Sequence, residues 1–236
     1  MGNTLVTGGA KNLGKEIVLK LAKNKQDLLI HYNKSKKEAF ELVKECHALG
    51  VEAEAIFGDF SNSQGIQAFI DLLKPFKKIK NIVNNVGNYL VKPVLETSLY
   101  EMNALFMTNL SAPLFLIQSL IPSIKEEKGS IVNIGVCGID HGRAENYSTV
   151  YSMTKASLLM LTRCLAKDLA LFDVTVNMVS PGMLEGSVDA PKDAKELPMK
   201  RFGTNQEVAD VVLFLLNPNN HYITGQNIEV AGGLRL

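Results

Sequence analysis

Two tyrosines and a lysine stand close together in the segment YSTVYSMTK, residues 147 to 155. Tyr151 and Lys155 are four residues apart, slightly more than one helical turn, so on a helix they share a face. A phenol has a reference pKa of about 10 and is a poor acid or base at neutral pH. An ammonium group beside it stabilises the phenolate and lowers that pKa. The spacing therefore predicts that Tyr151 donates a proton to a substrate oxygen with the help of Lys155.

Tyr147 is the alternative proton donor in this segment. It is eight residues from Lys155, which rotates it by a further 40° or so around a helix at about 100° per residue. Tyr151 is therefore the better candidate. Because a tyrosine followed by a lysine four residues later is frequent by chance, the interpretation depends on the elements that surround the pair.

Those elements alternate along most of the 236 residues between short apolar runs and longer amphipathic segments. Residues 13–21 carry an apolar helical stripe, and residues 36–50 form a second amphipathic segment that ends at a glycine. Strands separated by helices favour parallel crossovers. The pattern predicts an α/β, doubly wound, Rossmann-like fold with a seven-stranded parallel sheet and helices on both faces. The predicted strands are 3–8, 27–32, 51–59, 78–87, 129–135, 174–182 and 227–233.

No repeat or linker divides the chain, so we expect a single domain over residues 1–236. The irregular stretch 183–203 is polar, contains proline and follows the sixth predicted strand. Ligands of open α/β sheets bind at the carboxyl ends of strands and are covered there by such segments. We therefore expect a substrate lid at 183–203, the alternative being an ordinary surface loop.

Composition excludes several partners. Lys and Arg number 25 against 24 Asp and Glu, a net charge of +1, which gives no electrostatic reason to bind nucleic acid or an anionic membrane. Polar residues interrupt the most apolar stretches, so no membrane-spanning helix is expected. The three cysteines and four histidines show no metal-ligand spacing, and the cysteines are expected to be buried, reduced thiols. With no signal-peptide pattern at the amino terminus, we expect a cytoplasmic protein without a metal.

The segment TGGAKNLG, residues 7 to 14, joins the first predicted strand to the first helix. Gly8 permits a tight turn, Gly14 allows close packing of the helix on the sheet, and the helix amino terminus offers N–H groups to a pyrophosphate. Asn12 stands where glycine is commonest, and asparagine tolerates a positive φ. The alternative is a glycine-rich turn without a ligand. The candidate phosphate-binding residues are Gly8, Lys11, Asn12, Leu13 and Gly14.

The segment HYNKSKK, residues 31 to 37, bears on the choice of cofactor. A dinucleotide fold that prefers NAD places an acidic residue about 20 residues beyond the glycine loop, where it accepts from the ribose hydroxyls. No carboxylate is present here, and Asn33, Lys34 and Ser35 suit a 2′-phosphate better. The segment therefore predicts NADPH over NADH, the alternative being a solvated, lysine-rich helix start.

Together these motifs resemble the short-chain dehydrogenase/reductase family over essentially the whole chain. The resemblance implies that Asn109, in TNLSAP, is the catalytic asparagine, which holds a water in a proton relay. It implies that Tyr151 is the acid/base and that Lys155 is its partner and also holds the ribose. Further cofactor contacts that the resemblance implies are Asp59 and Phe60 in GDFS, Asn85 and Gly87 in NNVG, and the turn Pro181-Gly182.

One family position departs from the pattern. Family members usually end the fifth strand with Asn-Ile-Ser-Ser, and the second serine binds the substrate oxygen about thirteen residues before the tyrosine. Alignment on the strand puts Val136 in its place, whereas counting back from Tyr151 puts Gly138 there. Neither side chain can donate a hydrogen bond, and loss of such a donor commonly costs about 10²-fold to 10³-fold in rate. The residues near in sequence that could fill the gap are Asp140, His141 and Ser148.

Three functions remain open on the sequence. The leading hypothesis is NADPH-dependent hydride transfer to a carbonyl, with a 3-oxoacyl thioester as the commonest family substrate. The second is dihydropterin reduction, since pteridine reductases of this family carry aspartate at the serine position and Asp140 lies nearby. The third is a cofactor-binding protein with little catalysis, motivated by Val136 but opposed by the joint presence of Asn109, Tyr151 and Lys155. Enoyl reductases space Tyr and Lys seven apart, which no pair here matches.

The resemblance also bears on partners. Long apolar segments around residues 114–120 and 157–165 are expected to be core or subunit interface. In the family, the helices that carry Asn109 and Tyr151 bury such faces in a dimer or a tetramer. The resemblance thus implies a homo-oligomer, such as a homotetramer, that acts on a small-molecule or carrier-bound substrate.

Overall fold

The chain forms a parallel sheet of seven strands in the order β3-β2-β1-β4-β5-β6-β7. The structure is a computed structural model and describes residues 2–142, 144, 146–188, 190, 191 and 193–235. The strand order reverses between β1 and β4, the kind of place where open α/β sheets bind ligands. The sequence prediction of the fold is confirmed. The strands are β1 Asn3–Val6, β2 Leu28–Tyr32, β3 Ala53–Phe57, β4 Ile79–Asn84, β5 Ser130–Ile134, β6 Thr175–Pro181 and β7 Asn227–Val230.

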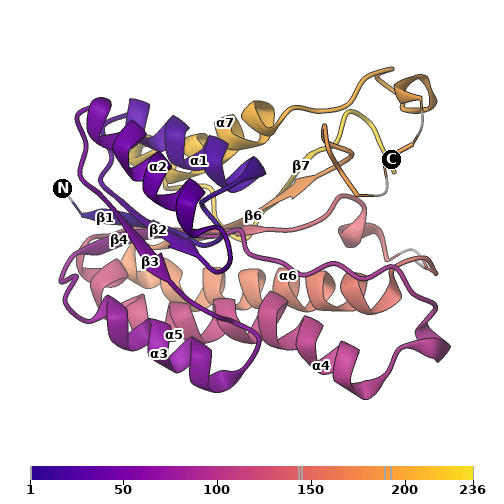
Figure 1. Cartoon of the computed structure of the whole chain (residues 1–236), viewed down its shortest axis with the longest axis horizontal. Coiled ribbons are helices and arrows are strands. Elements are labelled where there is room, and N and C mark those ends of the chain that lie inside the picture. Colours follow the sequence, from indigo (N-terminus) through magenta and orange to yellow (C-terminus); the bar gives the residue numbers. More distant parts are fainter. Residues whose placement is uncertain (1, 143, 145, 189, 192, 236) are drawn as a thin grey trace.

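Helices cover both faces of the sheet, as Figure 1 shows. One layer holds α1 (Asn12–Lys23), α2 (Lys36–Ala48) and α7 (Asn205–Leu216). The other holds α3 (Ser63–Leu73), α4 (Leu99–Phe106), α5 (Ala112–Glu126) and α6 (Thr149–Leu169). Successive strand residues point to opposite layers, so Leu5 belongs to one core cluster and Val6 to the other. Both faces being buried explains why the central strands are continuous apolar runs.

The stretch Leu99–Glu126 needs a correction to the sequence prediction. It is one helical run of 28 residues that is long and apolar enough to cross a membrane, with a mean hydropathy of 1.6 over its most apolar window. The prediction that polar residues exclude such a run is therefore wrong on length and composition. In the structure α5 lies against the sheet, with Leu116, Ile117 and Ile124 in the core, and the apolar character of the run is explained by that packing.

The cysteines are only partly where the sequence predicted them. Cys46 and Cys137 are buried, whereas Cys164 on α6 is exposed, so the expectation of three buried thiols is wrong for Cys164. Burial raises the pKa of the Cys46 thiol to about 11, which keeps it protonated and unreactive. Among the described residues, no three His, Cys, Asp or Glu side chains gather in a way that could hold a metal ion.

Candidate active site

The glycine loop between β1 and α1 has the strained geometry that its sequence indicates. Gly8 has φ +62°, and Asn12 adopts φ +47°, which asparagine tolerates better than most residues. A Cβ on Gly14 would lie 2.0 Å from the carbonyl oxygen of Gly8, so no larger residue fits there unless the loop moves. The Asn85 amide donates to the carbonyl oxygens of Thr7 (3.0 Å) and Gly8 (3.1 Å) and so ties the loop to the end of β4.

His31 on β2 supports the same loop, which the sequence did not indicate. The Gly8 N–H donates to His31 Nδ1 at 2.9 Å, so the ring proton must be on Nε2, which lies 3.1 Å from the Gly58 carbonyl oxygen. Burial lowers the pKa of His31 to about 4, and the ring is neutral at physiological pH. It also stacks on Phe60, with ring centroids 4.2 Å apart. His31 thus joins the glycine loop to the segment after β3.

A cavity of about 560 Å³ opens beside this loop at the carboxyl ends of β1, β2 and β3. Lys11, one of the residues expected at the phosphates, is in an ion pair with Glu38 on α2 at 2.6 Å, and both side chains are partly exposed. Such an exposed pair contributes little to stability, so a phosphate can compete for the lysine. The predicted cofactor residues that line this cavity are Gly8, Lys11, Asn33, Lys34, Ser35, Asp59 and Phe60.

A second cavity, of about 310 Å³, lies on the other side of the loop at the ends of β4, β5 and β6. Residues of the predicted lid, including Leu184 and Val188, line this cavity. Arg235 near the carboxyl terminus also lines it, and the sequence did not indicate that residue. The cavity also receives Tyr89, two residues beyond the NNVG motif. The predicted site residues that line it are Leu13, Asn85, Gly87, Tyr151, Lys155, Pro181 and Gly182. The structure thus brings most of the predicted cofactor residues to the walls of two cavities, whereas Asn12 and Gly14 line neither.

Lys155 and Tyr151 project from α6 into the second cavity. The Lys155 side chain is almost fully buried, and its Nζ donates to the Ile134 carbonyl oxygen at 2.8 Å. The same Nζ lies 5.7 Å from the centre of the Tyr151 ring, against which Tyr89 packs edge-on at 4.7 Å. Burial lowers the pKa of Lys155 to about 8, so the ammonium that would assist Tyr151 is held close to its titration point.

The lowered pKa of Lys155 predicts the pH dependence of any reduction in which Tyr151 donates the proton with the help of Lys155. Loss of the Lys155 proton removes the charge that stabilises the phenolate, so kcat/KM should be level below about pH 8. Above that pH it should fall roughly tenfold per unit. A pH–rate profile of the wild type measures this, and the residual activity of Lys155→Arg should show no such break because arginine stays charged. A profile of the wild type that stays level to pH 10, or the same break in Lys155→Arg, would contradict the assignment.

Asn109 is placed behind the cavity and not on its wall. It lies in a π-helical turn, Met107–Ser111, between α4 and α5 and is fully buried. Its Oδ1 accepts from the Asn88 N–H at 2.7 Å, and its Nδ2 donates to the Asn88 carbonyl oxygen and to Thr154 Oγ1. A Cβ on Gly87 would lie 3.4 Å from Lys155 Nζ and 3.6 Å from Asn109 Oδ1. Gly87 therefore keeps open the space between the amide oxygen and the ammonium.

The structure separates the candidates for the missing serine. Val136 lines the second cavity, as alignment on the strand predicts, whereas Gly138 does not. Asp140 and His141 do not line it either. The Asp140 carboxylate accepts two hydrogen bonds from Arg163 at 2.7 and 2.8 Å, and His141 Nδ1 lies 3.0 Å from the Arg235 carbonyl oxygen. Ser148 is buried and lines the cavity, so of the three candidates only Ser148 faces the site.

Tyr147 lies away from both cavities. Its side chain is 55% exposed, and its carbonyl oxygen accepts from the Lys92 N–H at 3.2 Å. The helical argument that favoured Tyr151 over Tyr147 therefore agrees with their positions. The chemical role of Tyr151 stays a prediction.

The predicted lid segment is closed at its base by backbone pairing. The Gly203 N–H donates to the Met183 carbonyl oxygen at 2.9 Å, and the Glu185 N–H donates to the Gly203 carbonyl oxygen at 3.0 Å. Residues 189 and 192 of the predicted lid lie outside the described residues. Because Met183, Leu184, Ser187 and Val188 line the second cavity, this segment forms part of its wall.

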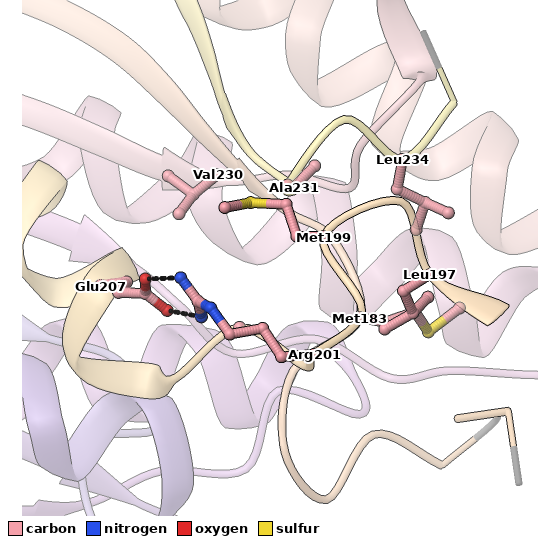
Figure 2. Close-up of a pocket in the computed structure, with 10 residues that line it drawn as sticks. Met183, Leu197, Met199, Arg201, Glu207, Val230, Ala231 and Leu234 are labelled. Carbon is pink, nitrogen blue, oxygen red and sulfur yellow. Dashed lines mark hydrogen bonds and ion pairs between the residues drawn. The ribbon is translucent and has the colours of Figure 1, made fainter. Parts of the chain in front are cut away.

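The far end of the lid is anchored to α7 and to the carboxyl-terminal segment. Arg201 makes two hydrogen bonds to Glu207 in the first turn of α7, at 2.6 and 2.9 Å, which Figure 2 shows as dashed lines. This guanidinium lowers the pKa of Glu207 to about 2. Met199 packs over the segment after β7, where a Cβ on Gly232 would come within 3.0 Å of its sulfur (Figure 2). The predicted lid segment is thus held at both ends, and its first residues, from Met183 to Val188, border the second cavity.

Comparison with known proteins agrees with this arrangement. Residues 8–235 match the family described as Enoyl-(Acyl carrier protein) reductase. The 3-oxoacyl-[acyl-carrier-protein] reductase FabG of Staphylococcus epidermidis is 31% identical over 98% of both chains. A Serratia marcescens short-chain dehydrogenase/reductase has a TM-score of 0.91 at 26% identity and covers 100% of this chain and 98% of its own. The chain belongs to the short-chain dehydrogenase/reductase family.

Family members similar to this chain carry several substrate names. The L-xylulose reductase of Caenorhabditis elegans is 33% identical over 97% of this chain and 94% of its own length. A metagenomic blue fluorescent protein, solved in complex with NADPH, has a TM-score of 0.90 at 31% identity and covers 100% of this chain and 98% of its own. Membership supports an oxidoreductase that uses a nicotinamide cofactor. The cavities fit such a group, because the first brings Gly8 and Lys11 of the glycine loop together with Lys34, and Gly87 lies on the wall of the second.

Proposed function

We propose that this protein reduces a ketone carbonyl with NADPH and that its substrate is a 3-oxoacyl thioester. The observation that carries the reduction is the placement of Tyr151 and the buried Lys155 together in a cavity that adjoins the glycine loop. The substrate class is supported by the curated relatives named as 3-oxoacyl-[acyl-carrier-protein] reductases, which match along almost the whole chain.

The residues divide the work as follows. NADPH, when bound, supplies the hydride. Tyr151 donates a proton to the substrate oxygen, and Lys155 stabilises the phenolate that remains. Asn109, whose amide oxygen is directed toward the space beside Gly87, holds a water that returns a proton to the site. The lid and Arg235 exclude bulk water from the cavity.

The experiment that tests this function is NADPH oxidation by the purified wild type with an acetoacetyl thioester, a dihydropterin and an enoyl thioester. Turnover of the acetoacetyl thioester is the expected result. Turnover of the dihydropterin alone, or of the enoyl thioester alone, would show that the substrate belongs to that class instead. Tight NADPH binding without turnover of any of them would favour a cofactor-binding protein with little catalysis. The dihydropterin alternative was motivated by Asp140, which does not line the second cavity and makes a salt bridge to Arg163.

The preference for NADPH is tested at Lys34. This lysine lines the first cavity beside Ser35, where a 2′-phosphate would lie. Lys34→Glu replaces an attractive charge by a repulsive one and is expected to lower the NADPH/NADH ratio of affinities at least about tenfold. Lys37→Glu is the matched control, because Lys37 lies three residues further on in the first turn of α2, is exposed and is not part of the cavity wall. Equal ratios in the two variants, measured by titration, would show that Lys34 does not select the cofactor.

A further inference from the structure

Carbonyl reduction places negative charge on the substrate oxygen. This charge is usually stabilised by more than one hydrogen-bond donor. A second preorganised donor at such an oxygen commonly contributes about 10²-fold to 10³-fold in rate. The end of β5 offers no side-chain donor at Val136. The N–H groups beside it are in use, since Gly135 donates to the Val179 carbonyl oxygen at 2.8 Å and Cys137 donates to that of Pro181 at 3.0 Å. A second side-chain donor must come from another part of the cavity wall.

Five hydroxyl side chains line this cavity within the part of the chain that the structure describes: Tyr89, Ser148, Tyr151, Ser152 and Ser187. Ser187 Oγ accepts from the Leu184 N–H at 3.0 Å and so serves the lid. Ser152 follows Tyr151 directly and therefore points about 100° away around α6. Tyr89 presents its ring to the Tyr151 ring. Ser148, three residues before Tyr151, remains as the hydroxyl nearest in helical phase to the phenol.

Ser148 has an unusual position for a serine at the start of a helix. It is the N-cap of α6, where serine ordinarily accepts a hydrogen bond from a backbone N–H of the first turn. Ser98 and Thr204 do so at α4 and α7, each at 3.2 Å, but the Ser148 side chain makes no such bond. Ser35 at the start of α2 also makes none and lines the cofactor cavity. Ser148 as a residue is buried, 6% exposed, yet its hydroxyl is not used to cap its helix.

We propose that Ser148 donates the second hydrogen bond to the substrate oxygen, beside Tyr151 and in place of any side chain at the end of β5. This inference rests on the proposed carbonyl reduction. As hydride forms the new C–H bond, the electron pair of the C=O π bond moves to oxygen. Tyr151 transfers its proton to that oxygen, whereas Ser148 keeps its own proton and only donates a hydrogen bond. The position on α6 explains how the chain accommodates valine at 136.

The test is Ser148→Ala with an acetoacetyl thioester as substrate. The matched control is Ser157→Ala, because Ser157 is on the same helix, donates to the Met153 carbonyl oxygen and does not line the cavity. Ser148→Ala is expected to lower kcat about tenfold to 10³-fold while NADPH affinity stays within about threefold. Ser157→Ala should stay close to the wild type. Adding Val136→Ser to Ser148→Ala should restore much of the lost rate, because the hydroxyl would return to the same oxygen from the strand side. A purely structural role of Ser148 would not be rescued from position 136.

Other outcomes separate the inference from the function on which it rests. Full activity in Ser148→Ala, with none in Tyr151→Phe, would overturn the role of Ser148 and leave carbonyl reduction standing. A wild type that reduces no carbonyl would overturn both. If Ser148→Ala failed to fold, Ser148→Thr and Ser148→Cys would decide, since threonine keeps the hydroxyl and the thiol is a weak donor. Equal rates in those two variants would count against the proposal.

Discussion

Replacing Tyr151 by phenylalanine is expected to lower kcat for reduction of an acetoacetyl thioester by about 10²-fold to 10⁴-fold, the usual contribution of a general acid. The change removes one hydroxyl from the cavity wall and leaves the ring that packs against Tyr89. Tyr151 does not line the first cavity, where we propose that the 2′-phosphate binds, so NADPH affinity should stay within a few-fold of the wild type. Steady-state rates and a fluorescence titration with NADPH measure the two quantities.

Tyr147→Phe is the control for this variant. Tyr147 carries the same side chain four residues earlier, is 55% exposed and does not line the cavity. Its removal should leave kcat close to the wild-type value. Retained turnover in Tyr151→Phe would remove Tyr151 from the mechanism, and a comparable loss in both variants would show that the effect is not specific to the cavity.

Gly14→Ala is expected to have the largest effect on cofactor binding. The added methyl group would lie 2.0 Å from the Gly8 carbonyl oxygen and 2.8 Å from the Asn85 amide nitrogen, well inside contact distance. Because the first of these atoms belongs to the backbone, the loop itself must move. Such overpacking commonly costs about 1–3 kcal/mol, and displacement of Gly8 should raise the Kd for NADPH at least about tenfold. Thermal unfolding and NADPH titration measure both effects.

Asn12→Gly is the matched control in the same loop. Asn12 has φ +47°, a conformation that glycine adopts without strain. The substitution should therefore keep NADPH affinity within a few-fold. If Gly14→Ala bound NADPH as tightly as Asn12→Gly, the glycine loop would not be the phosphate-binding element, and the 2′-phosphate argument at Lys34 would lose its basis.

The pattern of apolar runs and amphipathic segments predicted the architecture because each run reflects the burial of one strand or helix and can be recognised within a short stretch of sequence. Continuous apolar runs are typical of strands buried on both faces, and the seven runs became the seven parallel strands. The predicted ends were less accurate, since residues 58 and 59 and residues 85–87 follow β3 and β4 instead of extending them. Those residues turn away from the sheet and form the cavity walls. The polar residues within Leu99–Glu126 also led to the wrong expectation that this run is too polar to span a membrane. Its apolar residues pack on the sheet.

Many residues that line the two cavities could be predicted because strand ends of a parallel sheet meet at one edge. Gly8, Asn85 and Lys155 come from distant parts of the chain, yet each occupies a known place relative to that edge. His31 could not be found in this way. Its two ring nitrogens bind backbone groups of Gly8 and Gly58. Backbone partners of this kind cannot be recognised from residue types and their spacing.

The sequence by itself determined the family, the sheet and the tyrosine–lysine pair, because helical spacing and strand-end motifs are local properties of the chain. Only the tertiary structure showed which of Asp140, His141 and Ser148, all within twelve residues of Val136, lines the cavity. Asp140 is turned toward Arg163 on the following helix by a salt bridge, and His141 lies beside the Arg235 backbone. Ser148, in contrast, is carried to the cavity at the start of α6. The neighbours of a loop residue depend on packing between segments that are far apart in the sequence. Spacing along the chain does not reveal that packing.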